Sequence, residues 1–83
     1  MTISGRVVNQ NGTGVRNAIV TLTDVGPSTR RSVMTNPFGY YSFDNVLTGS
    51  TYTVSVLSKT FTFTSQNITP TGDLTNVDFT ALP

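Results

Sequence analysis

The sequence contains no cysteine, no histidine, no glutamate and no tryptophan. Without histidine and glutamate most of the usual general bases are missing, and without cysteine there is no thiol nucleophile. A chain without cysteine is equally suited to an oxidising or a reducing medium, so the redox compartment stays open. The missing residue types argue against an enzyme and against a bound cofactor.

Charged residues are also few, at 11% of the 83 residues, with a net charge of +1. This is too little positive charge to follow a phosphate backbone, so we expect no nucleic-acid partner. The sequence has no apolar run of membrane-spanning length, and membrane insertion is not expected. Threonine, serine and asparagine supply most of the polar surface instead.

All acidic residues are aspartates, and each is in or beside a turn or on an outward strand position. In turns, a short carboxylate accepts hydrogen bonds from nearby backbone N–H groups. No Asp-x-Asp-x-Asp-Gly loop is present, so we expect no metal site. A weak Ca²⁺ site built from Asp24, Asp44 or Asp73 with loop carbonyls stays an open alternative.

The stretch Thr35–Phe43 combines a tight turn with an alternating strand. Asn-Pro-Phe-Gly favours a turn, because Pro37 fixes φ and Gly39 can adopt a positive φ. After the turn, Tyr41 and Phe43 face one side and the intervening residues face the other. The same pattern follows a second glycine turn, with Tyr52, Val54 and Val56 on one side. We expect these two strands to form one layer of a small β-sandwich.

Period-2 patterns between turns fill the rest of the sequence, and no window has helical periodicity. Gly5 in the first strand suggests a bulge or a close backbone approach, and Asn11-Gly12 predicts a hairpin loop. The expected strands number about seven, which is typical of a sandwich. We expect one all-β domain over residues 1–83, with extended segments at 2–8, 17–23, 29–35, 40–43, 51–56, 59–64, 65–70 and 74–82. Phe61, Phe63, Val77, Phe79 and Ala81 are expected to face the core.

The order of these motifs resembles the carboxypeptidase regulatory-like domain family. Its "G-x-V … G-x-x-x-A-x-V-x-L" opening is similar to residues 3–22, and its "T-[DN]-x-x-G-x-[YF]-x-F" turn and strand to residues 35–43. Val46, Gly49 and Tyr52–Val54 resemble its next element, and residues 61–63 and 77–81 resemble its closing strands. Asn36 stands where aspartate is commoner in the family. The resemblance implies a Greek-key β-sandwich of the transthyretin (prealbumin) type, used as an accessory module of bacterial secreted or cell-surface proteins.

Two functions are open at this point. The first is a non-catalytic structural or interaction module: a spacer, scaffold or self-assembling subunit whose partners are neighbouring domains or copies of itself. The alternative is a carbohydrate- or peptide-binding module. Its candidate contacts are Phe38 at a loop tip, Tyr40 out of phase with the core, and the basic pair Arg30 and Arg31 on the third strand. Exposed aromatic residues often mark interfaces.

Overall fold

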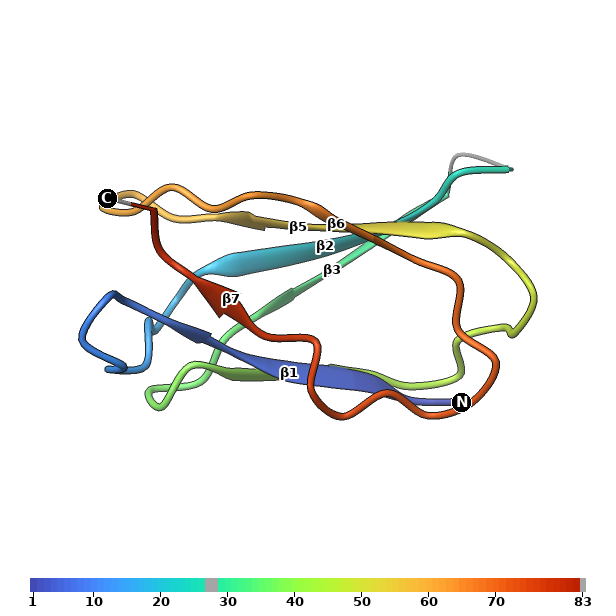
Figure 1. Cartoon of the computed structure of the whole chain (residues 1–83), viewed down its shortest axis with the longest axis horizontal. Coiled ribbons are helices and arrows are strands. Elements are labelled where there is room, and N and C mark those ends of the chain that lie inside the picture. Colours follow the sequence, from blue (N-terminus) through green and yellow to red (C-terminus); the bar gives the residue numbers. More distant parts are fainter. Residues whose placement is uncertain (27–28, 83) are drawn as a thin grey trace.

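The computed structural model describes residues 1–26 and 29–82, and these residues form an all-β structure (Figure 1). The strands are β1 (Ile3–Val8), β2 (Ile19–Asp24), β3 (Arg30–Met34), β4 (Tyr40–Phe43), β5 (Tyr52–Leu57), β6 (Gln66–Ile68) and β7 (Phe79–Thr80). Among the described residues no helix is long and apolar enough to cross a membrane. The prediction of an all-β sandwich with about seven strands is confirmed.

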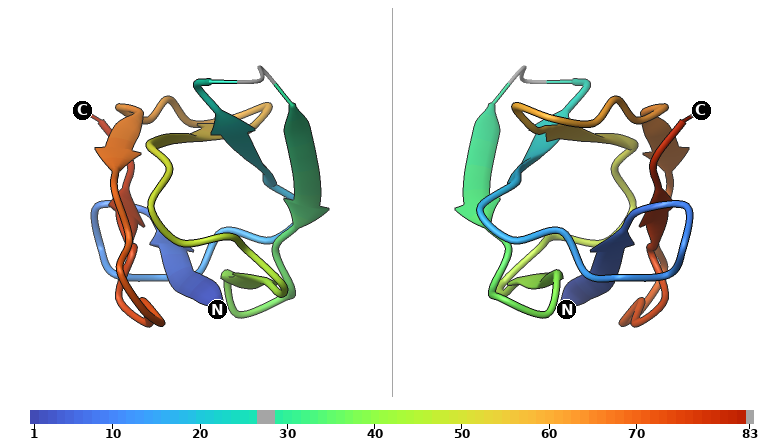
Figure 2. Two further views of the ribbon diagram at one scale, coloured as in Figure 1. Left: turned by 90° about the vertical axis from the view of Figure 1, so that its right-hand side faces the viewer. Right: turned by 90° about the vertical axis from the view of Figure 1, so that its left-hand side faces the viewer.

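The strands form two sheets, with the orders β4-β1-β7 and β3-β2-β5-β6. Seen end-on, the sheets enclose the interior from opposite sides (Figure 2). The β2–β3 and β5–β6 connections stay within one sheet, and the other connections between consecutive strands cross from one sheet to the other. In the smaller sheet, β1 pairs with β4 antiparallel and with β7 parallel.

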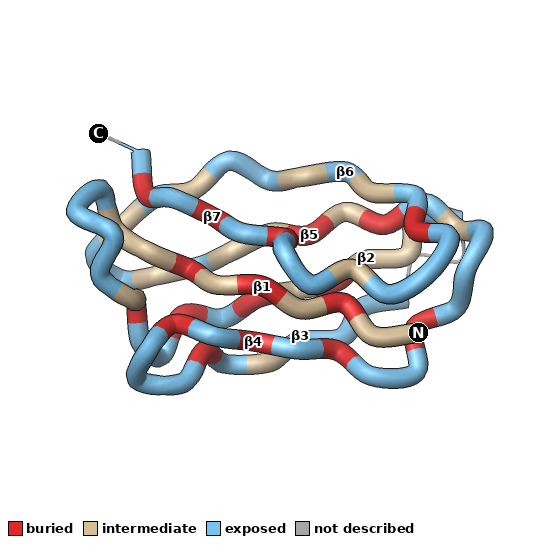
Figure 3. Tube along the Cα trace, turned by 60° about the horizontal axis from the view of Figure 1, so that its bottom comes forward, coloured by how far each residue is buried: buried red, intermediate tan, exposed pale blue. Residues whose placement is uncertain are grey.

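Side chains from both sheets meet in one core because each strand alternates inward and outward residues. Buried and more exposed positions alternate along β1 and β4 (Figure 3). The buried cluster contains Ile3, Val7, Val15, Ala18, Val20, Leu22, Tyr41, Phe43, Val46, Tyr52, Val54, Val77 and Phe79. The inward positions predicted for β4 and for the last segment are therefore confirmed.

The last segment lies along β1 over most of its length. Ser4 N–H donates to the Leu74 carbonyl (2.8 Å), and Val77 N–H donates to the Ser4 carbonyl (3.1 Å). At the far end of β1, Ala81 N–H donates to the Val8 carbonyl (3.0 Å). The chain begins at one end of the long axis and finishes at the other (Figure 1), and that axis measures 34 Å.

Gly5 is required by the close contact between β1 and the last segment. A Cβ atom at residue 5 would lie 1.9 Å from the Val77 carbonyl oxygen, which is far inside van der Waals contact. The same carbonyl accepts a hydrogen bond from the buried Tyr41 hydroxyl. The close backbone approach predicted for this glycine is confirmed.

The expectation that β4 and β5 share one layer is wrong, because they belong to opposite sheets. The chain crosses between them over residues 44–51, where Val46 enters the core. The Tyr52 hydroxyl donates to the Leu47 carbonyl (2.9 Å) and fixes the corner. The inner faces of the two strands therefore look at each other across the core.

The hairpin predicted around Gly12 is correct for the turn and wrong for the strand pairing. Gly12 has a φ of 82°, and Asn9 N–H donates to the Thr13 carbonyl (2.8 Å). Only an isolated bridge between Val8 and Gly14 follows. β1 and β2 then part, because Val15 and Ala18 turn inward and take the chain to the other sheet.

Residues 59–65 form no strand, contrary to the alternation that predicted one. Phe61 and Phe63 do pack against the core, but both are only partly buried. β5 pairs through Tyr52, Thr53 and Val54 with β6, which leaves this connecting segment without a strand neighbour there. The alternation therefore marks the side that faces the core and not a sheet ladder.

Candidate binding surface

The turn before β4 is held by Asn36. Its side-chain Oδ1 accepts hydrogen bonds from the backbone N–H groups of Phe38 (3.0 Å) and Tyr40 (3.0 Å). Asn36 N–H also donates to the Tyr40 carbonyl (3.0 Å), and Gly39 has the predicted positive φ, at 87°. These bonds order the turn, so the two aromatic residues on it are presented from a fixed backbone.

Phe38 and Tyr40 are exposed, at 67% and 53% of their surface, and Arg6 joins them. The Arg6 guanidinium carbon lies 5.1 Å from the Tyr40 ring centroid, and Arg6 Nε donates to the Phe38 carbonyl (2.9 Å). A cation over an aromatic face is an attractive contact. We call Arg6, Phe38 and Tyr40 the aromatic platform. Sequence reasoning missed Arg6, because only the β1–β4 register places it opposite Tyr40.

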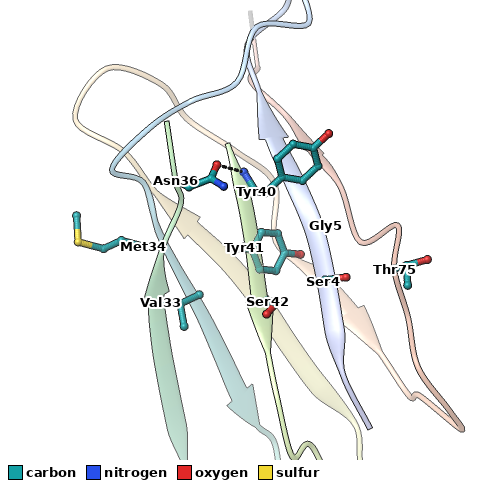
Figure 4. Close-up of a pocket in the computed structure, with 9 residues that line it drawn as sticks. All are labelled: Ser4, Gly5, Val33, Met34, Asn36, Tyr40, Tyr41, Ser42 and Thr75. Carbon is teal, nitrogen blue, oxygen red and sulfur yellow. Dashed lines mark hydrogen bonds between the residues drawn. The ribbon is translucent and has the colours of Figure 1, made fainter. Parts of the chain in front are cut away.

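An open groove of about 650 Å³ lies beside the platform. Its lining consists of Ser4, Gly5, Val33, Met34, Asn36, Tyr40, Tyr41, Ser42 and Thr75. In Figure 4, Met34 and Thr75 lie at the two sides of the groove, with Ser4 and Ser42 between them. The lining combines hydroxyl and amide groups with a tyrosine ring and contains no charged side chain. Such a surface can offer stacking and neutral hydrogen bonds.

Arg30 and Arg31 do not join the platform. They begin β3 at the end opposite to Met34, which faces the groove. Arg31 is opposite the inward Leu22 in the register and its guanidinium carbon lies 5.7 Å from the Phe43 ring centroid. Arg30 is opposite Thr23, on the other face of the strand. β3 is an edge strand, and charged residues on such a strand protect its edge from pairing with another chain.

The aspartates bond mainly to backbone N–H groups. The Asp24 carboxylate accepts from Gly26 (3.2 Å), and that of Asp73 accepts from Thr2 (2.8 Å). The carboxylate of Asp78 accepts from Arg6 N–H (2.8 Å). Among the described residues no group of three or more metal-ligating side chains occurs. Asp24 therefore has the turn role expected of it, whereas Asp73 and Asp78 join the last segment to residues near the start of the chain.

The Tyr41 hydroxyl lies beneath the groove and is held in its protonated form. Burial raises the pKa of the Tyr41 phenol well above its ordinary value, and the nearby Asp78 carboxylate raises it further. The Tyr41 hydroxyl donates its proton in a hydrogen bond to the Val77 carbonyl. Tyr41 is therefore a structural donor and a poor general acid or base.

The comparisons with known proteins agree with this fold. A family model of the carboxypeptidase regulatory-like domain matches residues 2–82. No curated protein sequence matches the chain. Modules of the matching family are non-catalytic. The match spans nearly the whole chain, including the turn before β4 and the last segment along β1, and the chain therefore belongs to the carboxypeptidase regulatory-like domain family.

Proposed function

We propose that the chain is a non-catalytic structural module of an extracellular bacterial protein, where it acts as a spacer or scaffold between neighbouring domains or copies of itself. The observation that carries this proposal is the position of the two termini at opposite ends of the 34 Å long axis (Figure 1). A domain joined at both ends then separates its neighbours by about its own length. A spacer needs no reactive side chains, and the hydroxyl-rich strand surfaces suit this role.

The sandwich is also closed along the side where β6 and the last segment meet. Gln66 Nε2 donates to the Asp78 carbonyl (2.7 Å), and Leu82 N–H donates to the Thr62 carbonyl (2.9 Å). On the opposite side, Thr35 bonds link the end of β3 to the start of β2. The bonds of Gln66 and Leu82 join the β5–β6 side of the larger sheet to the last segment and stiffen the module against bending, which a spacer requires.

Small-angle X-ray scattering of two copies joined end to end tests the spacer role. The maximum dimension should exceed that of one copy by about 34 Å, the length of one module. A single copy measured at the same mass concentration is the control. If the maximum dimension of the linked pair exceeds that of a single copy by 20 Å or less, which is the width of one module, the modules lie side by side. That result would refute the spacer role.

A second candidate function is the recognition of a neutral glycan or a peptide by the aromatic platform and its groove. The exposed rings beside an uncharged, hydroxyl-lined groove favour it. Titration with neutral oligosaccharides and uncharged peptides, followed by NMR, should shift the amide signals of the groove residues. Phe38→Ala and Tyr40→Ala should abolish the shifts, and Leu47→Ala, which alters an exposed apolar residue elsewhere, should not. Unchanged binding in both platform variants would exclude this site.

A further inference from the structure

Three exposed apolar side chains form a row across the outer face of the larger sheet. Ile19 of β2 is opposite Met34 of β3 on one side and Leu57 of β5 on the other. Their exposed fractions are 38%, 61% and 68%. The next outward positions along these strands are Thr21, Ser32 and Ser55, so the apolar surface is confined to the end of the sheet where the chain finishes.

A hollow of about 530 Å³ lies at this end of the sheet, beside Ile19 and Met34. Ile19 and Met34 form its apolar lining, and Arg16 and Lys59 line it together with uncharged polar residues. We call these four residues the cationic hollow. Its two charged side chains have the same sign, so a partner seated on it should present an apolar group beside acidic ones.

The opposite end of the same molecule offers that combination. Leu47, in the connection between β4 and β5, is 74% exposed, and Asp44 is three residues before it. Thr2 bonds to the carboxylates of both Asp73 (2.8 Å) and Asp44 (3.4 Å), which places these acids together. Arg31 also lines a hollow with Leu47, where Asp24 offsets its charge, and the Met1 ammonium donates to the Val46 carbonyl (3.1 Å) beside Leu47, so the acidic character of this end rests on Asp44 and Asp73. We call Leu47, Asp44 and Asp73 the acidic knob.

We propose that the acidic knob of one copy docks into the cationic hollow of a second copy. The two surfaces are complementary in charge and lie at opposite ends of the long axis. A knob and a hollow on different parts of one molecule make a head-to-tail contact, which adds copies in an open line instead of closing a dimer. The self-association named among the expected roles is thus assigned to the two ends of the module.

The size of the ends indicates a weak contact. The molecule measures 20 Å by 17 Å across its shorter axes, so an end presents about 340 Å² in projection. Two such surfaces bury less than the roughly 1,200 Å² of the smallest stable interfaces, and free copies should associate only at high concentration. Copies joined in one chain would meet at a much higher effective concentration.

Two half-blocked variants test this arrangement by light scattering. Met34→Asp places an acid in the hollow, where it repels the acidic knob, and Leu47→Ser removes the apolar group of the knob; both side chains are exposed in the native chain. The native chain should gain mass steadily as its concentration rises, and either variant alone should stay at the mass of one copy. An equimolar mixture should reach twice that mass and no more, since only one intact pair of surfaces remains. Thr80→Asp adds the same charge at an exposed position outside both surfaces and should behave as the native chain.

Several results would overturn the proposal. One is a native chain that stays at the mass of a single copy at millimolar concentration. Another is a dimer that Met34→Asp abolishes and Leu47→Ser leaves intact, which would indicate packing of two identical faces. NMR of the native chain needs no variant: its concentration-dependent shifts should include the amides of Ile19 and Leu47, and shifts confined to β3 or β6 would point to edge pairing instead. A monomeric chain refutes the docking and leaves the spacer role untouched.

Discussion

Removal of the Thr35 hydroxyl should destabilise the fold more than removal of its methyl group. Thr35 is the one buried polar residue in the described part of the chain, with 3% of its surface exposed. Its Oγ1 accepts a hydrogen bond from Ala18 N–H (3.0 Å) and donates one to the Val15 carbonyl (2.6 Å). Thr35→Val keeps the shape of the side chain but leaves both backbone groups without their side-chain partner.

The expected loss follows from the cost of buried polar groups that lack a partner. Each costs about 1–3 kcal/mol, so two give roughly 2–6 kcal/mol. A chain of this length has a free energy of unfolding of roughly 4–12 kcal/mol, so the loss is a large fraction of the total. At about 4–8 °C per kcal/mol, the Tm should fall by at least about 8 °C.

Urea unfolding followed by circular dichroism measures the difference, with Thr35→Ser as the matched variant. Serine keeps both hydrogen bonds and loses one methyl group, which costs about 0.8 kcal/mol. A Thr35→Val chain that is as stable as Thr35→Ser, or more stable, would show that these bonds contribute nothing net.

Three further predictions concern neighbouring features. Gly5→Ala should lower the free energy of unfolding in urea by more than about 2 kcal/mol, because its Cβ would overlap the Val77 carbonyl. Gly72→Ala, where the space is open, should change it by less than about 0.5 kcal/mol. Equal losses in the two variants would contradict the close approach. Asn36→Ala should lower the free energy of unfolding by about 1 kcal/mol through loss of the turn bonds, and Asn36→Asp, which can accept both bonds, should retain most of it; equal losses in the two variants would argue against the turn bonds. The pKa of Tyr41 is higher in the folded chain than its unfolded value of 10.0, so folding stability should fall as the pH rises above about 10, by up to about 1.4 kcal/mol per pH unit. Tyr41→Phe should flatten that slope, and an unchanged slope would refute the assignment.

The sequence predicted well those features that depend on local geometry. Alternation identified Tyr41, Phe43 and Phe79 as inward, and all three are buried. The Asn-Pro-Phe-Gly turn predicted a positive φ at Gly39, and the structure has one. Each of these properties is fixed within a few residues, so no knowledge of the partner strand is needed.

Features that depend on which strands become neighbours could not be predicted. The alternating pattern indicates which side of β4 and of β5 faces inward. The pattern would be the same whether the two strands shared one sheet or faced each other across the core. The Arg6–Tyr40 contact and the row of Ile19, Met34 and Leu57 arise only from the register. Phe61 and Phe63 alternate as in a strand but lie in a connection, because packing against the core requires no ladder.

The parallel pairing of β1 with the last segment determines how the module responds to tension. β1 runs away from the N-terminal end and the last segment runs beside it in the same direction, toward the C-terminal end. A force that pulls the two ends apart therefore drags these neighbouring segments past each other. The bonds from Ser4 to Leu74 and Val77, and from Ala81 to Val8, are then loaded in shear and must fail together instead of opening one at a time. A module pulled along its length resists through its own first and last segments.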